Sequence, residues 1–290
     1  MGIDTASTGG NHRQVRQPGN GFEWWYLQAT SRDFYLTLVC HLTSIPGNRA
    51  DEPYVSGTLL TQANGVEHVR APAWFNSDGR GYLKASEYVE ETAAGWSVQL
   101  SFPKTYVEIV VERLSDPWRT GNRSLIVKCG DDETHWSVPM PYARFRGRAH
   151  QMGRASRVSG WAYQDHNWGT APLLNFFDCW DWAAASGPSG TWVSASASIA
   201  GQPQAMGVHV GADGRMKETG PAPWNGPRRG DVSRIAQLPM KRTTYRVNAA
   251  TRIKYDRDAF EIHSRTGKFF GIQESLRQVS EGLADLRSTE

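Results

Sequence analysis

The sequence has little cysteine, no long apolar run and no marked excess of charge. Its 290 residues include three cysteines, Cys40, Cys129 and Cys179, and so small and uneven a number argues against a disulfide framework. No stretch approaches the roughly 20 apolar residues of a membrane-spanning helix. Residues 1–17 are polar and glycine-rich, without the apolar core of a secretory signal. We therefore expect a cytoplasmic protein, with any membrane contact peripheral and made through the substrate.

Charge and short motifs argue against several classes of function. The 32 basic and 29 acidic side chains give a net charge of +3, which is too small to predict a nucleic-acid partner. Arg144, Arg146 and Arg148 alternate along a predicted strand, where a solvated face is favoured over an anion-binding patch. The histidines lack the spacing of a metal site, and no glycine-rich nucleotide loop or Gly-x-Ser-x-Gly motif occurs. The sequence therefore predicts no metal and no cofactor.

Short alternating runs separated by turn residues dominate the chain. Residues 33–40 and 95–102 are examples, and many such runs with turns about every 8–12 residues are typical of an antiparallel β-sandwich or barrel. The length and the number of strands predict two domains, residues 1–145 and 146–290. Apolar residues at near-helical spacing in 272–286 predict a C-terminal helix. The expected fold class is therefore all-β with one terminal helix.

The most informative segment is the heptapeptide YQDHNWG at residues 163–169. On a strand, successive side chains point to opposite faces. One face would carry Trp161, Tyr163, Asp165 and Asn167, and the other Gln164, His166 and Trp168. Burial among aromatic rings raises the pKa of a carboxylic acid, which would let Asp165 donate a proton near neutral pH. Tyr163 would hold Asp165 in place or orient a water. That Asp165 instead caps a turn among core aromatics is an equally open interpretation.

Two further aromatic clusters are candidates for the same site. In the tetrapeptide EWWY at residues 23–26, large rings occupy both faces of a predicted strand, which suits a strand packed on two sides. Trp25 and Glu23 are candidates for the pocket, although a structural pairing of Glu23 with an arginine is favoured over catalysis. Trp180 and Trp182 share a predicted strand face and would either line the cavity or plug the end of a barrel.

These motifs resemble those of the carotenoid 1,2-hydratase (hydroxyneurosporene synthase) family. Residues 23–26 and, about 140 residues later, residues 160–169 follow that family's order and spacing. The second motif is fairly specific, and the first marks a wider group of two-domain lipocalin-like proteins that includes Diels–Alderases. The resemblance implies two lipocalin-like antiparallel β-barrels, with a pocket near their interface.

The resemblance also implies a chemistry. It implies hydration of a terminal isoprenoid double bond without a cofactor, with Asp165 as the acid and Tyr163 assisting. The family's hydratases are longer than this chain, which leads us to expect a smaller pocket and a substrate shorter than a C40 carotene.

We therefore predict a lyase or isomerase that protonates a C=C bond of a hydrophobic isoprenoid or polyene. Hydration is the first expectation and cyclisation of the cation the second. A pericyclase, which needs only a preorganised pocket, and a non-enzymatic lipophile carrier are the alternatives, and the oligomeric state is left open. The predicted catalytic residues are Asp165 and Tyr163. The predicted substrate-binding residues are Trp161, Trp168, Trp180, Trp182, Trp25, Glu23, Asn167 and His166.

Overall fold

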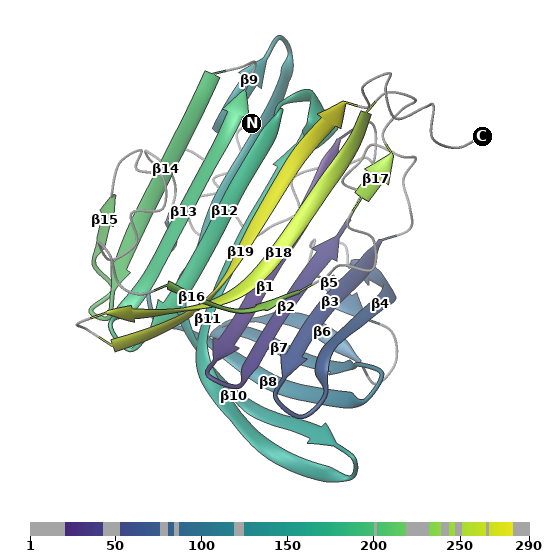
Figure 1. Ribbon diagram of the computed structural model, residues 1–290, viewed down its shortest axis with the longest axis vertical. Helices are drawn as coiled ribbons and strands as arrows, with labels where there is room; N and C mark the ends of the chain where they lie inside the picture. Colours follow the sequence, from purple (N-terminus) through teal and green to yellow (C-terminus); the bar gives the residue numbers. More distant parts are fainter. Residues whose placement is uncertain are drawn as a thin grey trace.

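The described part of the chain is almost entirely β-structure. The computed structural model describes residues 21–42, 53–75, 81–83, 87–118, 125–199, 202–218, 232–238, 244–246, 251–264 and 267–280. Within these ranges the strands form two antiparallel sheets, and the only helical element is a short 3₁₀-helix, η3 (Leu173–Asn175). The expected all-β class is therefore confirmed (Figure 1).

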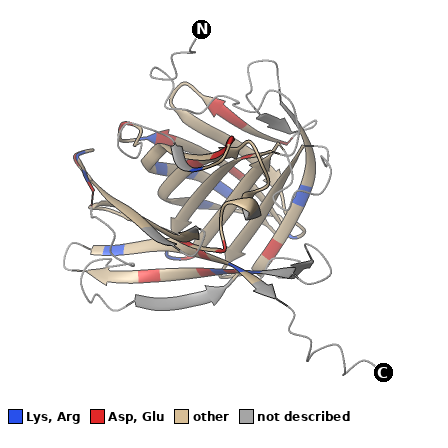
Figure 2. Cartoon of the chain, turned by 90° about the horizontal axis from the view of Figure 1, so that it is seen from above, with Lys and Arg blue, Asp and Glu red and all other residues tan. Residues whose placement is uncertain are grey.

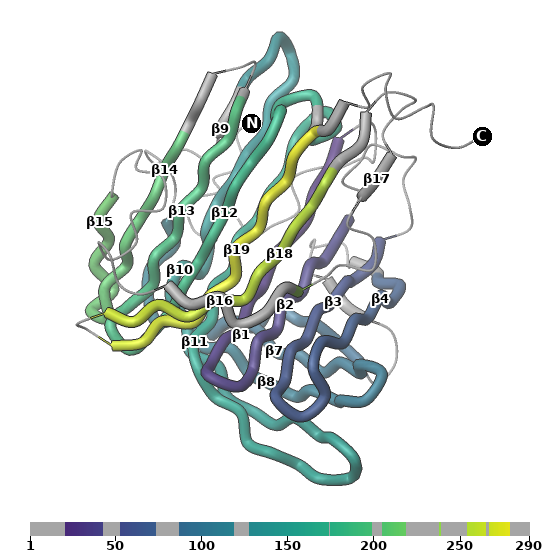
Figure 3. The backbone as a smooth tube through the Cα atoms, in the orientation of Figure 1, coloured from purple at the N-terminus to yellow at the C-terminus, as the bar shows by residue number. Residues whose placement is uncertain are grey.

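The first sheet takes up the N-terminal part of the chain and has eleven strands. They are β1 (Phe22–Ser31), β2 (Phe34–His41), β3 (Tyr54–Thr61), β4 (Gly65–Phe75), β5 (Gly81–Leu83), β6 (Tyr88–Thr92), β7 (Gly95–Ser101), β8 (Thr105–Arg113), β9 (Leu125–Cys129), β10 (Asp132–Gln151) and β11 (Arg154–Gly169). Their order is β5-β4-β3-β2-β1-β11-β10-β8-β7-β6, with β9 beside β10. The end strands β5 and β6 contact each other, so the sheet curls back on itself in a lipocalin-like manner (Figure 3).

The second sheet has eight strands and follows in the chain. They are β12 (Cys179–Gly187), β13 (Gly190–Ile199), β14 (Gln202–Gly211), β15 (Met216–Glu218), β16 (Val232–Gln237), β17 (Thr244–Arg246), β18 (Thr251–Ser264) and β19 (Gly267–Ser280). Their order is β15-β14-β13-β12-β19-β18-β16, with β17 beside β18. β18 and β19 pass over β1 and β2, with β19 in contact with β1 (Figure 1).

The predicted C-terminal helix is wrong, because this segment forms the strand β19. Ile272, Glu274 and Leu276 are buried at every second position, and Gln273 between them is exposed. This two-residue period is that of a strand, and β19 pairs with β12 on one side and β18 on the other. Hydrogen bonding to a strand on each side therefore makes this segment a strand, although its apolar residues have near-helical spacing. Residues 281–286 of the predicted helix lie outside the described residues.

The predicted domain boundary at residue 145 lies inside β10. β10 and β11 form a long hairpin that belongs to the first sheet along its whole length. The chain passes from the first sheet to the second between Gly169 and Cys179, through the turn that contains η3. The division into two independent domains stays a prediction.

Strand β1 is buried on both faces because it lies between the inside of the first sheet and the second sheet. Trp25, Leu27 and Ala29 belong to the core enclosed by the first sheet. Trp24 and Tyr26 belong to the core shared with the second sheet. The large rings on both faces of residues 23–26 are therefore explained by two-sided packing.

Two polar side chains of β1 join the sheets. Gln28 Nε2 donates to the carbonyl of Ala184 on β12 at 3.0 Å, and Thr30 Oγ1 donates to the carbonyl of Phe270 on β19 at 3.0 Å. Both side chains are fully buried, so leaving either unpaired would cost about 1–3 kcal/mol. These bonds hold the two sheets in a defined position. Charged residues of both signs are spread over both sheets (Figure 2).

Candidate active site

Strand β11 places the candidate acid on the face that meets the second sheet. Asp165 lies opposite Tyr26 of β1, and Asn167 lies opposite Trp24. Because side chains alternate along a strand, Tyr163, Asp165 and Asn167 face the same way. The sequence pattern and the backbone therefore agree on this face.

The carboxyl group of Asp165 is held by hydrogen bonds from its own face of the sheet. Tyr163 Oη donates to Oδ2 at 2.8 Å, and Asn167 Nδ2 donates to Oδ1 at 2.8 Å. The indole of Trp136, on β10, provides a further hydrogen bond. Both oxygens thus have a partner, which fixes the orientation of the carboxyl group and stabilises its ionised form.

Burial nevertheless raises the pKa of Asp165 to about 7. The side chain is only 4% exposed, and removal from water disfavours the carboxylate. The hydrogen bonds from Tyr163, Trp136 and Asn167 lower the pKa, and the nearby carboxylate of Glu274 raises it. A large share of Asp165 therefore carries a proton near neutral pH. Burial also raises the pKa of Tyr163 well above its usual value, so this phenol stays neutral.

Asp165 borders a cavity of about 90 Å³ between the two sheets. The first sheet contributes Trp24, Tyr26, Thr134, Trp136, Asp165 and Asn167, and the rest of the lining is Leu173, Phe177, Trp180, Asp181, Trp182, Ala195, Ser196, Ala197, Met206 and Glu274. Pockets that enclose a whole drug-sized molecule usually measure about 300–1,000 Å³. This cavity is therefore suited to the end of a long apolar chain.

Four of the ten predicted site residues line this cavity. They are Asp165, Asn167, Trp180 and Trp182. Tyr163 stands behind the acid, where its ring packs against Trp182 at a centroid distance of 5.3 Å. Trp161 stacks on Tyr142 at 5.3 Å and is not part of the lining.

The remaining four predicted residues cluster on the opposite face of the first sheet. His166 Nε2 lies 2.9 Å from Glu23 Oε1, and both side chains are fully buried. Trp25 stacks on His166 with ring centroids 4.7 Å apart, and the ring of Trp168 lies tilted against His166 at 4.5 Å. The partner that the structure shows for Glu23 is thus a histidine, where the sequence favoured an arginine. This cluster supports β1 and β11 from behind the cavity.

Sequence reasoning missed several lining residues, and the reasons differ. They are Trp24, Tyr26, Trp136, Phe177, Met206 and Glu274. Trp24 and Tyr26 had a usable signal, because they occupy the face of β1 opposite Trp25. Glu274 was missed because its segment was predicted to form a helix. Trp136 and Met206 reach the cavity through the order of the strands, which spacing along the chain does not reveal, and Phe177 reaches it from the segment between η3 and β12.

Within the described ranges, no three His, Cys, Asp or Glu side chains lie close enough together to hold a metal ion. Nor does that part of the chain contain a helix with the length and apolar character needed to cross a membrane.

The raised pKa of Asp165 makes the stability of the fold depend on pH. The folded protein keeps this proton up to about pH 7, whereas an unfolded aspartate has a pKa of 3.8. The protonated carboxyl group stabilises the fold fully below pH 3.8. This contribution falls by about 1.4 kcal/mol per pH unit as the pH rises to the folded pKa of about 7, and about 4 kcal/mol is lost in all. Asp165→Asn cannot ionise. We expect its stability relative to the parent protein to rise by this amount between pH 4 and pH 8, as measured by urea unfolding.

A matched substitution controls for the change from carboxylate to amide. The side chain of Asp213 is 58% exposed. We expect the difference in unfolding free energy between Asp213→Asn and the parent protein to be the same at every pH. If Asp165→Asn differs from the parent protein by the same free energy at pH 5 and pH 8, the pKa of Asp165 is not raised.

Comparison with known proteins identifies a family. The model of the family "Carotenoid hydratase CrtC" matches residues 119–277, which is more than half of the chain. A segment of 70 residues is 37% identical to the acyclic carotenoid 1,2-hydratase of Thiocapsa roseopersicina. That match covers 24% of this chain and 17% of the relative, so it spans only a small part of the relative's length.

Solved structures share the fold over most of the chain. A putative AttH from Nitrosomonas europaea has a TM-score of 0.62 at 13% identity, with 88% of this chain and 92% of that chain covered. Kievitone hydratase from Nectria haematococca has a TM-score of 0.54 at 12% identity, with 93% and 92% covered. CghA with Sch210972 has a TM-score of 0.55 at 12% identity, with 91% and 89% covered. At these identities the likeness shows the fold alone.

Proposed function

Because the chain belongs to the carotenoid hydratase CrtC family, we propose that it adds water to a C=C bond of an acyclic isoprenoid, with Asp165 as the acid. The observation that carries the proposal is the buried carboxyl group with a pKa of about 7 at the wall of an aromatic cavity. An alkene is a poor base, so the acid must be protonated at the working pH and the resulting cation must be stabilised. Both requirements are met by the groups around Asp165.

The first step is transfer of the proton of Asp165 to one alkene carbon. At a terminal isopropylidene group, the new C–H bond forms on the CH carbon and leaves a tertiary cation. The hydrogen bonds from Tyr163 and Asn167 then stabilise the carboxylate that remains. The ring faces of Trp24, Trp180 and other lining aromatics stabilise the cation, by about 2 kcal/mol or more for a desolvated contact.

Capture of the cation by water completes the reaction. The C–O bond forms at the tertiary carbon, and the water loses a proton, so the sum is alkene plus water giving a tertiary alcohol. Neither step moves electrons to or from an outside group, which is why the proposal requires no cofactor. The size of the cavity supports a terminal double bond as the reacting group, with the rest of the substrate extending out of the cavity. A C40 chain and a shorter chain would present the same reacting end, so both serve as probes, and a substrate shorter than C40 stays a prediction.

Reaction in deuterated water tests the proposal. We expect the protein to convert lycopene, or the shorter probe geranylgeraniol, to a tertiary alcohol that carries one deuterium on the carbon next to the carbinol carbon, as read by mass spectrometry and NMR. A cyclic product with solvent deuterium would replace hydration by cation cyclisation. A product without solvent deuterium would indicate a pericyclic reaction, and tight binding without any product would indicate a carrier.

A further inference from the structure

A second buried carboxylate borders the cavity, on the sheet opposite Asp165. Glu274, on β19, lines the cavity and is 6% exposed. Its cross-strand neighbours are Trp182 of β12 and Arg257 of β18. The acid therefore comes from the first sheet and Glu274 from the second, with the cavity between them.

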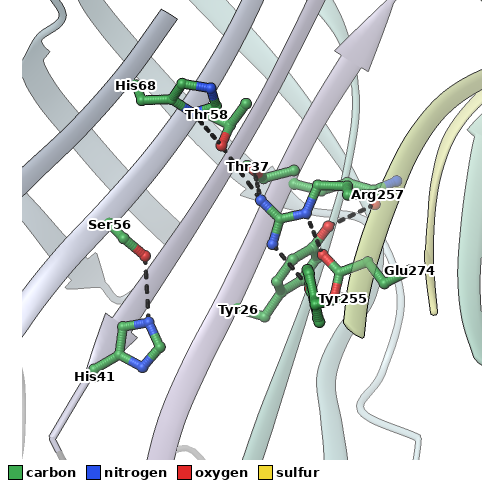
Figure 4. Close-up of polar contacts among 10 residues, drawn as sticks. Tyr26, Thr37, His41, Ser56, Thr58, His68, Tyr255, Arg257 and Glu274 are labelled. Atoms are coloured by element: carbon green, nitrogen blue, oxygen red, sulfur yellow. Dashed lines mark hydrogen bonds and ion pairs between the residues drawn. The ribbon is translucent and has the colours of Figure 1, made fainter. Parts of the chain in front are cut away.

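Glu274 pairs with a cation, whereas the groups that donate hydrogen bonds to Asp165 are neutral. Arg257 Nε lies 2.7 Å from Glu274 Oε1 in a buried ion pair, as Figure 4 shows. Burial acts to lower the pKa of Arg257, but Glu274 and Tyr255 raise it above the usual value, so the guanidinium stays charged. Glu274 thus faces the cavity paired with a charged guanidinium, whereas the carboxyl group of Asp165 is held by the neutral donors Tyr163 and Asn167. Two carboxyl groups in such opposite surroundings are typical of an acid and its partner base.

Arg257 is itself fixed from the first sheet. Its Nη1 donates to Thr37 Oγ1 at 2.8 Å and to Thr58 Oγ1 at 3.4 Å, and its Nη2 donates to Tyr255 Oη at 3.2 Å. Figure 4 shows these side chains converging on the guanidinium from β2, β3 and β18. The position of the Glu274 carboxylate is therefore set by a network that crosses between the sheets.

Glu274 keeps capacity to bind a water from the cavity. A carboxylate offers about four acceptor positions, and the contacts with Arg257 and Tyr255 occupy two of them. The other carboxylate in the lining, Asp181, is placed differently. Its side chain alternates along β12 with those of Trp180 and Trp182 and so points to the far side of the second sheet. There Arg277 donates to its two oxygens at 2.7 and 2.6 Å, and Ser275 donates to Oδ1.

We propose that Glu274 holds the attacking water and accepts its proton. The inference rests on the proposed hydration. As the water oxygen bonds to the tertiary cation, one O–H bond of that water breaks and its proton passes to Glu274. Exchange with solvent then removes the proton from Glu274 and returns one to the Asp165 carboxylate, so the site is restored. A strong base is not required, because a water bonded to a cation is very acidic. The contribution of Glu274 is to position that water.

Glu274→Gln separates this role from a structural one. The variant can still protonate the alkene, but the cation is no longer captured efficiently. It then loses to Asp165 either the added deuteron or the original hydrogen of the same carbon, and loss of the original hydrogen leaves deuterium in the alkene. In deuterated water with lycopene, we expect formation of the alcohol to fall by about 10²–10⁴-fold, while the recovered alkene gains deuterium at a rate within about tenfold of the parent reaction. The ratio of exchange to hydration, read by mass spectrometry, should therefore rise at least tenfold.

Matched variants complete the experiment. Glu261→Gln, on β18, removes a carboxylate that pairs with His263 and Lys268 away from the cavity, and should leave both rates unchanged. Glu274→Asp keeps the charge for Arg257 but withdraws it from the cavity; if Glu274→Gln does not fold, this variant should show the same raised ratio. Circular dichroism checks the fold of each variant.

The outcomes distinguish the two proposals. Hydration that is unchanged in folded Glu274→Gln, or exchange and hydration that fall together in both Glu274 variants, would overturn the role of Glu274 alone. A parent protein that places no deuterium in either alkene or alcohol would overturn the proposed hydration itself.

Discussion

Replacing Asp165 by asparagine is expected to lower the turnover of lycopene by about 10²–10⁴-fold, while binding of lycopene changes little. Asparagine has nearly the same size and keeps a carbonyl oxygen for the hydrogen bond from Tyr163, but it has no proton to give. Single-turnover kinetics measure the chemical step, and quenching of the lining tryptophans measures binding. The parent rate should itself fall above about pH 7, because the acid then loses its proton.

Two results would count against Asp165 as the acid. One is a turnover within threefold of the parent rate, which would favour a pericyclase whose barrier is lowered by fit alone. The other is loss of lycopene binding together with turnover, which would assign Asp165 to the shape of the cavity. The exposed Asp213→Asn serves again as the matched control and should retain the parent rate.

Replacing Arg257 by methionine is expected to destabilise the fold by about 3–5 kcal/mol. Arg257 is 5% exposed and pairs with a carboxylate that is equally buried. Methionine fills much of the volume but leaves the buried Glu274 without its cationic partner, and it removes the guanidinium that donates to Thr37. Urea unfolding followed by tryptophan fluorescence measures the loss.

Two comparisons show whether the burial of the ion pair is the cause. The double variant Arg257→Met with Glu274→Met should recover most of the lost stability, because no charge is then left without its partner. Arg144 and Glu112 form an ion pair at 3.2 Å with both side chains about half exposed; Arg144→Met should therefore cost less than about 1 kcal/mol. A loss at Arg257 as small as that at Arg144 would contradict the argument.

The architecture was predictable from the sequence because its strands alternate clearly. The burial pattern of β7 follows the alternation of residues 95–102. The large rings in residues 23–26 predict a strand that packs on both faces, and β1 is buried on both. The C-terminal segment was not predictable in this way. Ile272, Leu276 and Val279 have helical spacing, since a strand would place Val279 on the other face, but pairing with β12 and β18 makes this segment a strand.

The candidate site was predictable only where its residues are neighbours in the chain. Alternation along residues 160–168 places Tyr163, Asp165 and Asn167 on one face, and the backbone has them there. Glu274 lies more than 100 residues further on and reaches the cavity through the order of strands in the second sheet. Its environment depends on Arg257, a cross-strand neighbour that no local pattern connects with it.

Asp165, the proposed acid, and Glu274 belong to different sheets, so the distance between them is set by how the sheets are docked. That docking depends on side chains outside the cavity, among them Gln28 and Thr30 of β1 and the guanidinium of Arg257. A slide of one sheet over the other would move the cation nearer to water or nearer to a second double bond, with Asp165 and Glu274 both intact. The outcome of the proposed reaction would therefore depend on residues that never touch the substrate.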